Sequence, residues 1–558
     1  QVSSLKVAQI QNLAAANVTA MSTSQVNALT TAQLQVFSTG QMGALTSAQL
    51  GAMSTEQLAS IKSNLMVALN TGALAGLGSD QIQSLSPAQI GQMSSQQIGA
   101  LSDAQVAAIS TTDVAALTGR QLSAMSTSQM QALTTDQITA LKPSQVVSIP
   151  TQSMAALTAG QVSAFTAQQV AYLTNSQMGA LTSAQVGALT TDQIPHLKAA
   201  QLAAVSTTGL AGLDSTQIEA FSAVQIGGLR TEQIAALATD QIAAIASEDI
   251  RGLTRQQIAA LQSDQVGNLT SDQLTAFNAT QLAAIETQDL IALSTDNVVA
   301  LTTEQMAAFT TAQINNLTSD QIVALETEDL NALKGTQIVA LETGQFAAMT
   351  TDQIQSFKPS QIASIETRDL AVLSSDQIQA LTSDQLPALT TYQFKNLTTD
   401  AMVALTTDQI TALSTKEISV MTDAQLSKLT TDQVAALTTA QVQAIPTTGL
   451  AAMGTDQVVA FTSEQLAAFT GNHMRVLTTD QMQAFTTDQM PGFETRDLVV
   501  LTATQLNATT SDQIDALTTG QVASLTNAQI ASLGQDQIGA LNTSQIVALG
   551  QRDRKSVV

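Results

Sequence analysis

The chain has 558 residues, a net charge of −24 and 11% charged residues, against about 25% in a typical globular protein. It contains no Cys and no Trp, which excludes a disulfide framework, a thiolate metal site and a cysteine nucleophile. Its two histidines, His196 and His473, leave little for acid–base catalysis or zinc. The acid excess opposes a phosphate-binding track, so composition argues against an enzyme and a nucleic-acid-binding protein.

The apolar residues are not gathered into membrane-spanning segments. They make up 44% of the chain, which is the opposite of a disordered composition, yet no run reaches the roughly 18 residues of a membrane span. The chain starts at Gln1 without a basic-then-apolar signal sequence. We therefore expect no membrane insertion, and either a leader that has been removed or a piece of a longer chain.

A period of eight residues runs from the first residue to Gln545 without an insertion or deletion. One column of this octad holds glutamine in 53 of 69 octads, and the next column is apolar in all 69. The column four residues after glutamine, mostly Leu, is apolar in every octad except the one with Thr509. The consensus is L-T-T-D-Q-I-x-A. Such a strict short repeat predicts one repetitive architecture instead of several domains.

Each octad carries the signals of a helix start. A Thr or Ser followed three residues later by Gln is a capping box, and the apolar residues on either side stand at the positions of a hydrophobic staple. The residue before glutamine is Asp or Glu in 25 octads, where negative charge meets the positive end of a helix. The next start comes eight residues later, so each octad predicts one or two helical turns followed by an extended corner.

Proline placement supports short helices. Pro87, Pro143 and Pro359 fall at the first helical position, where a missing N–H is tolerated. Pro195, Pro387 and Pro491 fall two residues after glutamine, where a continuing α-helix would need that N–H.

Two apolar side chains per octad are too few for a core, so successive octads must wind until these columns converge, as in a solenoid. We predict an all-α, rod-like solenoid of one- to two-turn helices over residues 1–550, followed by an off-pattern basic tail or junction at 551–558. Octads without glutamine recur forty residues apart, as at Asp249, Asp289, Asp329 and Asp369. This second period suggests either one turn of five octads or, as we favour, about twenty residues per coil.

The sequence predicts no catalytic, cofactor-binding or metal-binding residue. Nearly all acids occupy octad columns where helix-start electrostatics or capping explains them. His196 and His473 are 277 residues apart and read as single substitutions in the repeat. One carboxylate per octad gives no set of six to eight oxygens for calcium. Weak surface calcium binding by the E-T-x-D-L octads, such as 286–290 and 366–370, stays an alternative.

Two resemblances bear on function. The string L-T-x-x-Q-V/I-x-A-I/L is similar to the first helix of TAL-effector repeats, but their second helix and 34-residue period are absent. Over residues 1–550 the octads resemble the tandem L-T-x-D/E-Q-I/V-x-A-L arrays of very large bacterial secreted and cell-surface proteins. That resemblance implies an extracellular fibre, stalk or matrix component.

Charge is uneven along the chain, with a net charge of −1 in residues 1–200 and −23 in residues 201–558. The tail brings Arg552, Arg554 and Lys555 together. It is either an exit from the array or a basic end that docks on an acidic neighbour to make head-to-tail filaments. We expect a non-enzymatic structural element of an extracellular filament, fibre or surface layer. Its expected partners are itself, through head-to-tail or lateral self-assembly, or neighbouring surface proteins. The alternatives are a stalk that presents a binding domain outside this sequence, and a binding module for calcium or glycans.

Overall fold

A computed structural model describes the backbone of residues 1–555 and the side chains of residues 1–550. The chain falls into two compact units, Gln1–Leu293 and Ser294–Val558.

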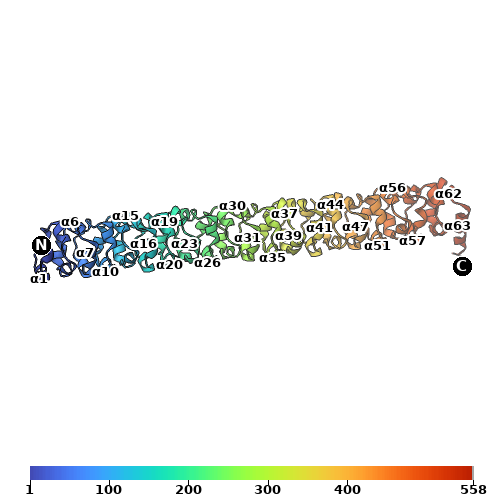
Figure 1. Ribbon diagram of the computed structural model, residues 1–558. Helices are drawn as coiled ribbons and strands as arrows, with labels where there is room; N and C mark the ends of the chain where they lie inside the picture. Colours follow the sequence, from blue (N-terminus) through green and yellow to red (C-terminus); the bar gives the residue numbers. More distant parts are fainter. Residues whose placement is uncertain (556–558) are drawn as a thin grey trace. The chain divides into compact units, whose positions relative to one another are not determined.

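Every octad forms one short helical segment, and the described residues contain no strand. There are 63 α-helices and six 3-10 helices in this part of the chain. The α-helices have four to six residues, except α63 (Thr543–Lys555). In each unit the segments follow one another as successive small coils along the chain (Figure 1). The all-α solenoid of very short helices that the sequence predicts is confirmed.

The capping box forms as the sequence predicts. In α16 (Thr135–Ala140) the cap residue Thr134 accepts a hydrogen bond from the Gln137 backbone N–H at 3.2 Å. The Gln137 Oε1 atom accepts one in return from the Thr134 N–H at 2.8 Å. The helix ends at Ala140, and the next residue, Leu141, is extended, with a φ of −62° and a ψ of 138°. Each octad therefore satisfies its own helix start before the chain turns the corner.

The chain changes direction at every corner without left-handed backbone, since no described residue has a positive φ. The prolines behave as expected. Pro87, Pro143 and Pro359 stand at the first position of α10 (Pro87–Gln92), α17 (Pro143–Val146) and α42 (Pro359–Ile362). Where proline falls after glutamine, the octad shortens to a 3-10 helix, in η3 (Ile194–His196), η5 (Leu386–Ala388) and η6 (Met490–Gly492). The remaining 3-10 helices are η1 (Val2–Ser4), η2 (Ser63–Ala68) and η4 (Ile250–Gly252).

The two apolar columns form the core of each unit. The column after glutamine is almost completely buried, as at Ile138 with no exposed surface, and the Leu column is nearly so, as at Leu141 with 3%. Burial of a large aliphatic side chain contributes about 1.5–3 kcal/mol, so these columns supply the main drive for winding. The core is therefore a continuous strip within each unit.

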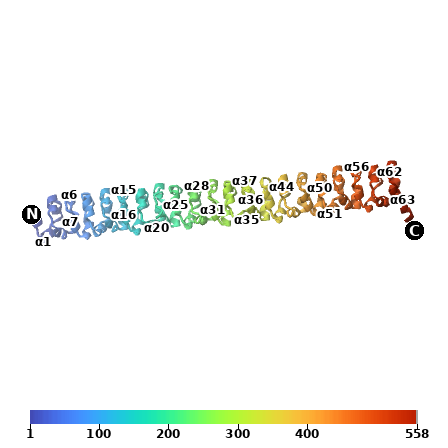
Figure 2. The same ribbon diagram turned by 45° about the vertical axis from the view of Figure 1, so that its right-hand side comes forward.

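Each octad packs against the octads three and four places away. Helix pairs in contact are typically three octads apart, as for α15 (Thr127–Ala132) with α18 (Thr151–Ala156). Side-chain hydrogen bonds join residues 25 apart and residues 28 and 31 apart. One turn of the coil thus takes between three and four octads. Figure 2 shows the successive coils. The expectation of about twenty residues per coil, or of a five-octad turn, is wrong. The forty-residue pattern records where another residue replaces glutamine, and it does not correspond to one turn of the coil.

Backbones of neighbouring coils approach closely at small residues before the Leu column. At Gly76 a Cβ atom would overlap the carbonyl oxygen of Ser47, and at Gly252 it would overlap that of Ala223. Glycine is required at these two places for close approach and not for its conformational freedom.

The last described helix, α63, continues beyond the usual length. Its backbone is described to Lys555. The side chains of the predicted basic tail, 551–558, lie outside the described residues.

Candidate functional site

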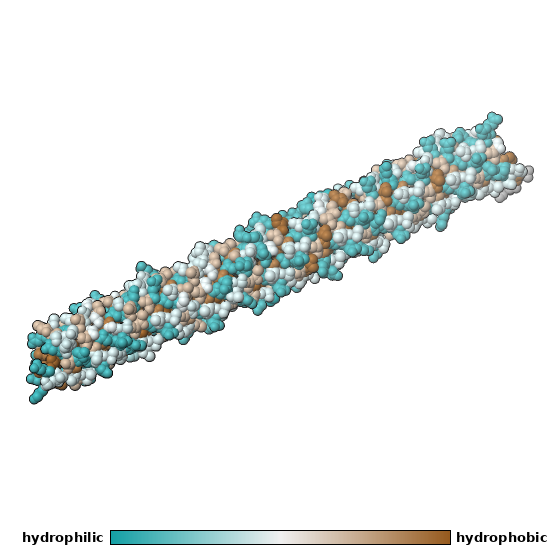
Figure 3. Space-filling model, turned by 45° about the horizontal axis from the view of Figure 1, so that its top comes forward, coloured by the Kyte–Doolittle hydropathy of each residue, from teal (hydrophilic) through white to brown (hydrophobic). Residues whose placement is uncertain are grey.

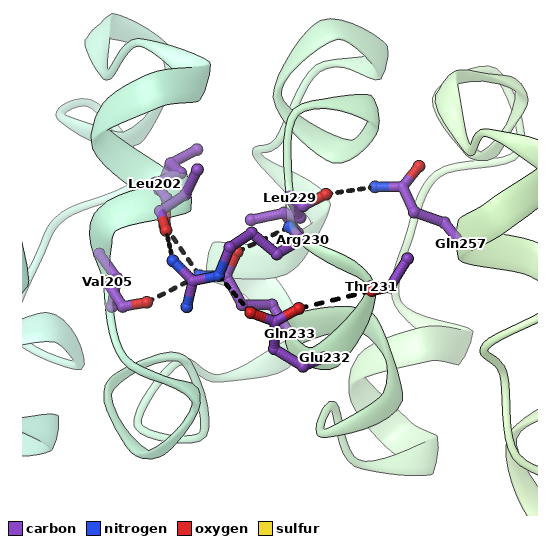
Figure 4. Close-up of polar contacts among 9 residues, drawn as sticks. Leu202, Val205, Leu229, Arg230, Thr231, Glu232, Gln233 and Gln257 are labelled. Carbon is purple, nitrogen blue, oxygen red and sulfur yellow. Dashed lines mark hydrogen bonds and ion pairs between the residues drawn. The ribbon is translucent and has the colours of Figure 1, made fainter.

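The glutamine column forms a buried ladder that joins each coil to the preceding one. Gln233 is fully buried in α27 (Thr231–Ala235). Its Nε2 donates to the carbonyl oxygens of Leu202 at 3.0 Å and Val205 at 2.7 Å (Figure 4). Its Oε1 accepts from the Arg230 backbone N–H at 2.8 Å. One amide group thus caps its own helix and ties it to a corner four octads earlier.

The same contacts recur along both units, to a carbonyl 28 residues back and to a second one 31 or, as for Gln217 and Gln281, 30 residues back. Gln257 donates to Leu229 at 2.7 Å in the first unit, and Gln441 donates to Leu413 at 2.6 Å in the second. The sequence pattern indicates the capping role of glutamine, whereas the inter-coil role is missed. The acceptors are backbone carbonyls, which every residue has, so no residue type marks them in the sequence. They can be identified only once the number of residues in one turn of the coil is known. We call this column the glutamine ladder.

The ladder explains why the residue is glutamine and not glutamate. A carboxyl group can accept from the cap N–H, but it has no NH₂ group to donate to two carbonyls. Glu417 is the single glutamate in this column. It is buried, and its Oε2 accepts from the Ser414 N–H at 2.8 Å and the Ser414 hydroxyl at 2.5 Å. Glu417 therefore keeps the cap and lacks the donor pair of the ladder.

His473 reproduces the glutamine geometry with a ring. Its Nδ1 accepts from the Thr470 backbone N–H at 3.3 Å, and its Nε2 lies 3.0 Å from the Ile445 carbonyl oxygen, 28 residues back. The ring is buried and packs edge-on against Phe469 at 5.7 Å between centroids. Burial lowers the pKa of His473, and the hydrogen bond to Ile445 opposes that shift in part. The histidine is thus a neutral structural replacement for glutamine.

In two octads, those of Asp249 and Asp289, aspartate in the ladder column reverses the direction of the inter-coil hydrogen bond. The Asp249 Oδ1 atom accepts from the Ala223 N–H at 2.7 Å, and Asp289 Oδ1 accepts from the Ser263 hydroxyl at 2.5 Å. Both donors stand 26 residues back, at the first position of a helix. For Asp113 that place is taken by Pro87, which has no N–H.

Several of these buried carboxylates have oxygens without a hydrogen bond among the described residues: Asp113 Oδ1, both Oδ atoms of Asp369, and Asp497 Oδ2. Burial raises the pKa of Asp113 and of Asp497. It also raises the pKa of Asp329 to about 6, with a further contribution from Glu326 and Glu328. The pKa of Asp369 rises to about 6 through burial, which Arg368 opposes and Glu366 and Glu342 reinforce.

The remaining candidate residues do not converge. His196 is exposed, and its Nδ1 lies 3.1 Å from the backbone oxygen of Asp192 in the same octad. In the part of the chain that the structure describes, no group of three or more His, Asp or Glu residues is placed to hold a metal ion. In the E-T-x-D-L octads the aspartate is buried, whereas the glutamate is exposed at Glu286 and Glu326 and half-buried at Glu366 and Glu494. Glu366 pairs with Arg368 at 2.7 Å instead of converging with Asp369.

The same hollows and single apolar side chains recur along the surface from octad to octad and are not gathered in one region. Shallow hollows between coils recur at equivalent octad positions, lined by Ser79 and Asp136 in one place and by Ser215 and Asp272 in another. On the face shown in Figure 3, apolar residues lie singly among hydrophilic ones. Scattered single apolar residues are normal for a protein surface. Many of the exposed ones stand two residues after the ladder column, among them Val67, Val147, Val299, Val323, Val403 and Val459.

Comparison with known proteins shows the family. Twelve segments match the model of the ALTTAQ repeat: residues 28–63, 58–95, 75–111, 106–143, 242–279, 282–319, 322–358, 362–399, 386–415, 402–439, 435–471 and 490–527. These segments cover more than half of the chain, and the chain belongs to the ALTTAQ repeat family. The predicted tandem repeat array is thereby confirmed.

The other comparisons add no functional information. Among curated proteins, none matches the chain. A solved structure described as "Structure of APUM23-GGAAUUGACGG" is 10% identical and has a TM-score of 0.15, with 92% of this chain and 93% of that chain covered. A TM-score this low carries no argument.

Proposed function

We propose that this member of the ALTTAQ repeat family is a non-enzymatic structural protein that forms an element of an extracellular filament, fibre or surface layer. The observation that carries the proposal is the glutamine ladder. Its polar atoms are used up by capping and by inter-coil hydrogen bonds, as at Gln233. In a repeat protein, the interfaces between neighbouring repeats add up to the stability of the whole array. A chain that repeats one such contact along its length therefore suits an architectural role.

Self-association is the partner interaction that we propose. A net charge of −23 in residues 201–558 and the basic residues Arg552, Arg554 and Lys555 favour docking of the basic tail of one copy on the acidic part of a neighbouring copy. Contacts of this heterologous kind propagate without closure. We expect filaments of the purified chain at low salt and weaker assembly at high salt. Assembly that is unchanged by deletion of residues 551–558 would contradict a role for the tail.

The second candidate is a stalk that holds a binding domain, outside this sequence, away from the cell. Electron microscopy of the purified protein separates the two proposals, because a filament element forms long regular fibres and a stalk stays as single particles. A third candidate, a module for calcium or glycans, would be supported by a higher unfolding temperature on addition of the ligand.

The proposed location is the cell surface or the extracellular space. Among the described residues, none of the helices has the length and apolar character needed to span a bilayer. The location can be tested with a membrane-impermeant amine reagent on intact producing cells. Lys6, Lys62 and Lys334, which are exposed in the folded chain, would be labelled if the protein lies outside.

A further inference from the structure

Six octads place aspartate, and not glutamine, at the ladder position: those of Asp113, Asp249, Asp289, Asp329, Asp369 and Asp497. Asp369 is the extreme case. Its side chain has no exposed surface, and neither carboxylate oxygen has a hydrogen bond within the described residues. A buried charge without hydrogen bonds is costly, and protonation removes that cost.

We propose that the octads of Asp329 and Asp369 are acid-responsive joints, at which uptake of a proton by the buried carboxyl group strengthens the packing of that octad against the preceding coil. In a glutamine octad the side-chain NH₂ donates to carbonyls 31 and 28 residues back, as Gln353 does at 2.8 Å to both Ile322 and Leu325. An ionised carboxylate offers these carbonyls only further negative charge. A protonated carboxyl group is neutral and carries one donor.

The charges around Asp369 do not neutralise it. On α43 (Thr367–Leu370) the Arg368 Nε atom lies 3.6 Å from Asp369 Oδ1 but 2.7 Å from Glu366 Oε2, and it is more than half exposed. From α40 (Thr343–Ala348), which packs against α43, Glu342 at the cap raises the pKa of Asp369 further. Other ionisable groups on neighbouring octads are exposed, among them Lys334, Asp376, Tyr392, Lys395 and Asp400.

Asp329 offers an independent joint whose ionisable neighbours are mainly acidic. On α38 (Thr327–Ala332) it is flanked by Glu326 and Glu328, and its side chain is only 4% exposed. Exposed acids also lie on both helices that pack against α38: Glu304 on α35 (Thr303–Ala308) and Asp352 on α41 (Thr351–Ser356). The base at this place, Lys358, donates from Nζ to the Asn331 carbonyl at 2.8 Å.

The direction of the pH effect follows from proton linkage. The pKa of about 6 in the folded chain lies above the roughly 3.9 of an unfolded aspartate. Between these values the folded state binds more protons than the opened state. The stability that one such aspartate contributes is therefore fully present below about pH 4 and is lost as pH rises through 6. For one such group, local opening becomes up to about tenfold rarer when pH falls from 7.5 to 5.

The test is hydrogen exchange of the full chain, followed by mass spectrometry at pH 5 and 7.5 and corrected for the intrinsic exchange rate. Peptides covering residues 326–333 and 366–373 report on the two joints. We expect protection up to about tenfold higher at pH 5 in the native chain. Asp329→Asn and Asp369→Asn should each raise protection at pH 7.5 and abolish its pH dependence in their own peptide. Asn297, buried in the same column, shows that asparagine fits there.

The control is Asp352→Asn, which removes an exposed acid beside α38 and should leave the pH dependence of residues 326–333 intact. Added salt separates the joint from general repulsion in this acidic chain, because salt screens exposed charges much more than buried ones. A pH dependence that survives both Asp→Asn variants, or that disappears in 0.5 M salt (roughly a 4 Å screening length), would overturn the proposal.

Discussion

The Nε2 atom of His473 lies 3.0 Å from the carbonyl oxygen of Ile445, at the place where glutamine side chains donate in the other coils. The Thr470 N–H donates to the opposite ring nitrogen, Nδ1, so the hydrogen sits on Nε2. A second proton would turn Nδ1 into a donor facing an N–H. The histidine can occupy the ladder only while it is neutral.

We predict that acid loosens the octad of His473. Burial lowers its pKa in the folded chain below the unfolded value of about 6.5, so the opened state binds more protons as pH falls below that value. The stability that this residue contributes is present above about pH 6.5 and is lost as pH falls toward the folded pKa. Hydrogen exchange of residues 470–477 at pH 7.5 and 5 measures the effect, and His473→Gln should remove it.

The control for this experiment lies in the same neighbourhood. Asp497 on α57 (Thr495–Leu498), which packs against α55 (Gly471–Val476), has a raised pKa and the opposite pH response. Both chains in the comparison contain Asp497, so its effect cancels. An equal loss of protection at pH 5 in the native chain and in His473→Gln would contradict the prediction.

We predict that Gln233→Glu destabilises its coil by about 2–4 kcal/mol. The substitution keeps the acceptor for the Arg230 N–H but removes the donors to Leu202 and Val205, and each buried polar group left unsatisfied costs about 1–3 kcal/mol. Local hydrogen exchange gives the difference. The matched control is Gln9→Glu, because Gln9 is exposed and its Oε1 accepts only from the Lys6 N–H. We expect a change within about 0.5 kcal/mol there, and equal effects at both positions would argue against the ladder.

Local structure could be predicted from the sequence, because each octad contains both partners of its cap. Thr134 and Gln137 are three residues apart, so their contact follows from helix geometry alone. The same holds for the effect of Pro195, which removes an N–H inside its own octad and leaves a 3-10 helix.

The coil size and the second role of glutamine could not be predicted, because they depend on how far one octad turns the chain. That angle depends on the backbone dihedral angles at each corner, such as the ψ of 138° at Leu141, and no sequence motif specifies these angles. The buried state of Asp369 was missed for the same reason. From the sequence alone, a charged residue at a helix start is expected to be exposed to solvent. Its burial becomes evident only when the position of the neighbouring coil is known.

We predict that Ser263→Ala destabilises the first unit by about 1–2 kcal/mol around α33 (Thr287–Leu290). The Ser263 hydroxyl is a donor to the buried Asp289 Oδ1 across the coil, and losing a partner of a charged group costs about this much. Ser263→Thr keeps the hydroxyl and should retain the stability. Ser79→Ala is the control, because Ser79 has the same helix position but faces a glutamine octad. Hydrogen exchange of residues 286–293 that is unaffected by Ser263→Ala would contradict the prediction.

Glu417 is the one glutamate in the ladder column. Glu417→Gln should stabilise its coil by about 1–3 kcal/mol, because the new NH₂ group can donate to the carbonyls of Leu386 and Leu389, which stand 31 and 28 residues back. The cap is unchanged, since a glutamine Oε1 can accept from the Ser414 N–H as Glu417 Oε2 does at 2.8 Å. Glu464→Gln, at an exposed second helical position in α54 (Ser463–Ala467), removes the same charge without adding a ladder bond. If both substitutions stabilise the chain equally in local hydrogen exchange, the gain comes from reduced repulsion and not from a restored hydrogen-bond pair.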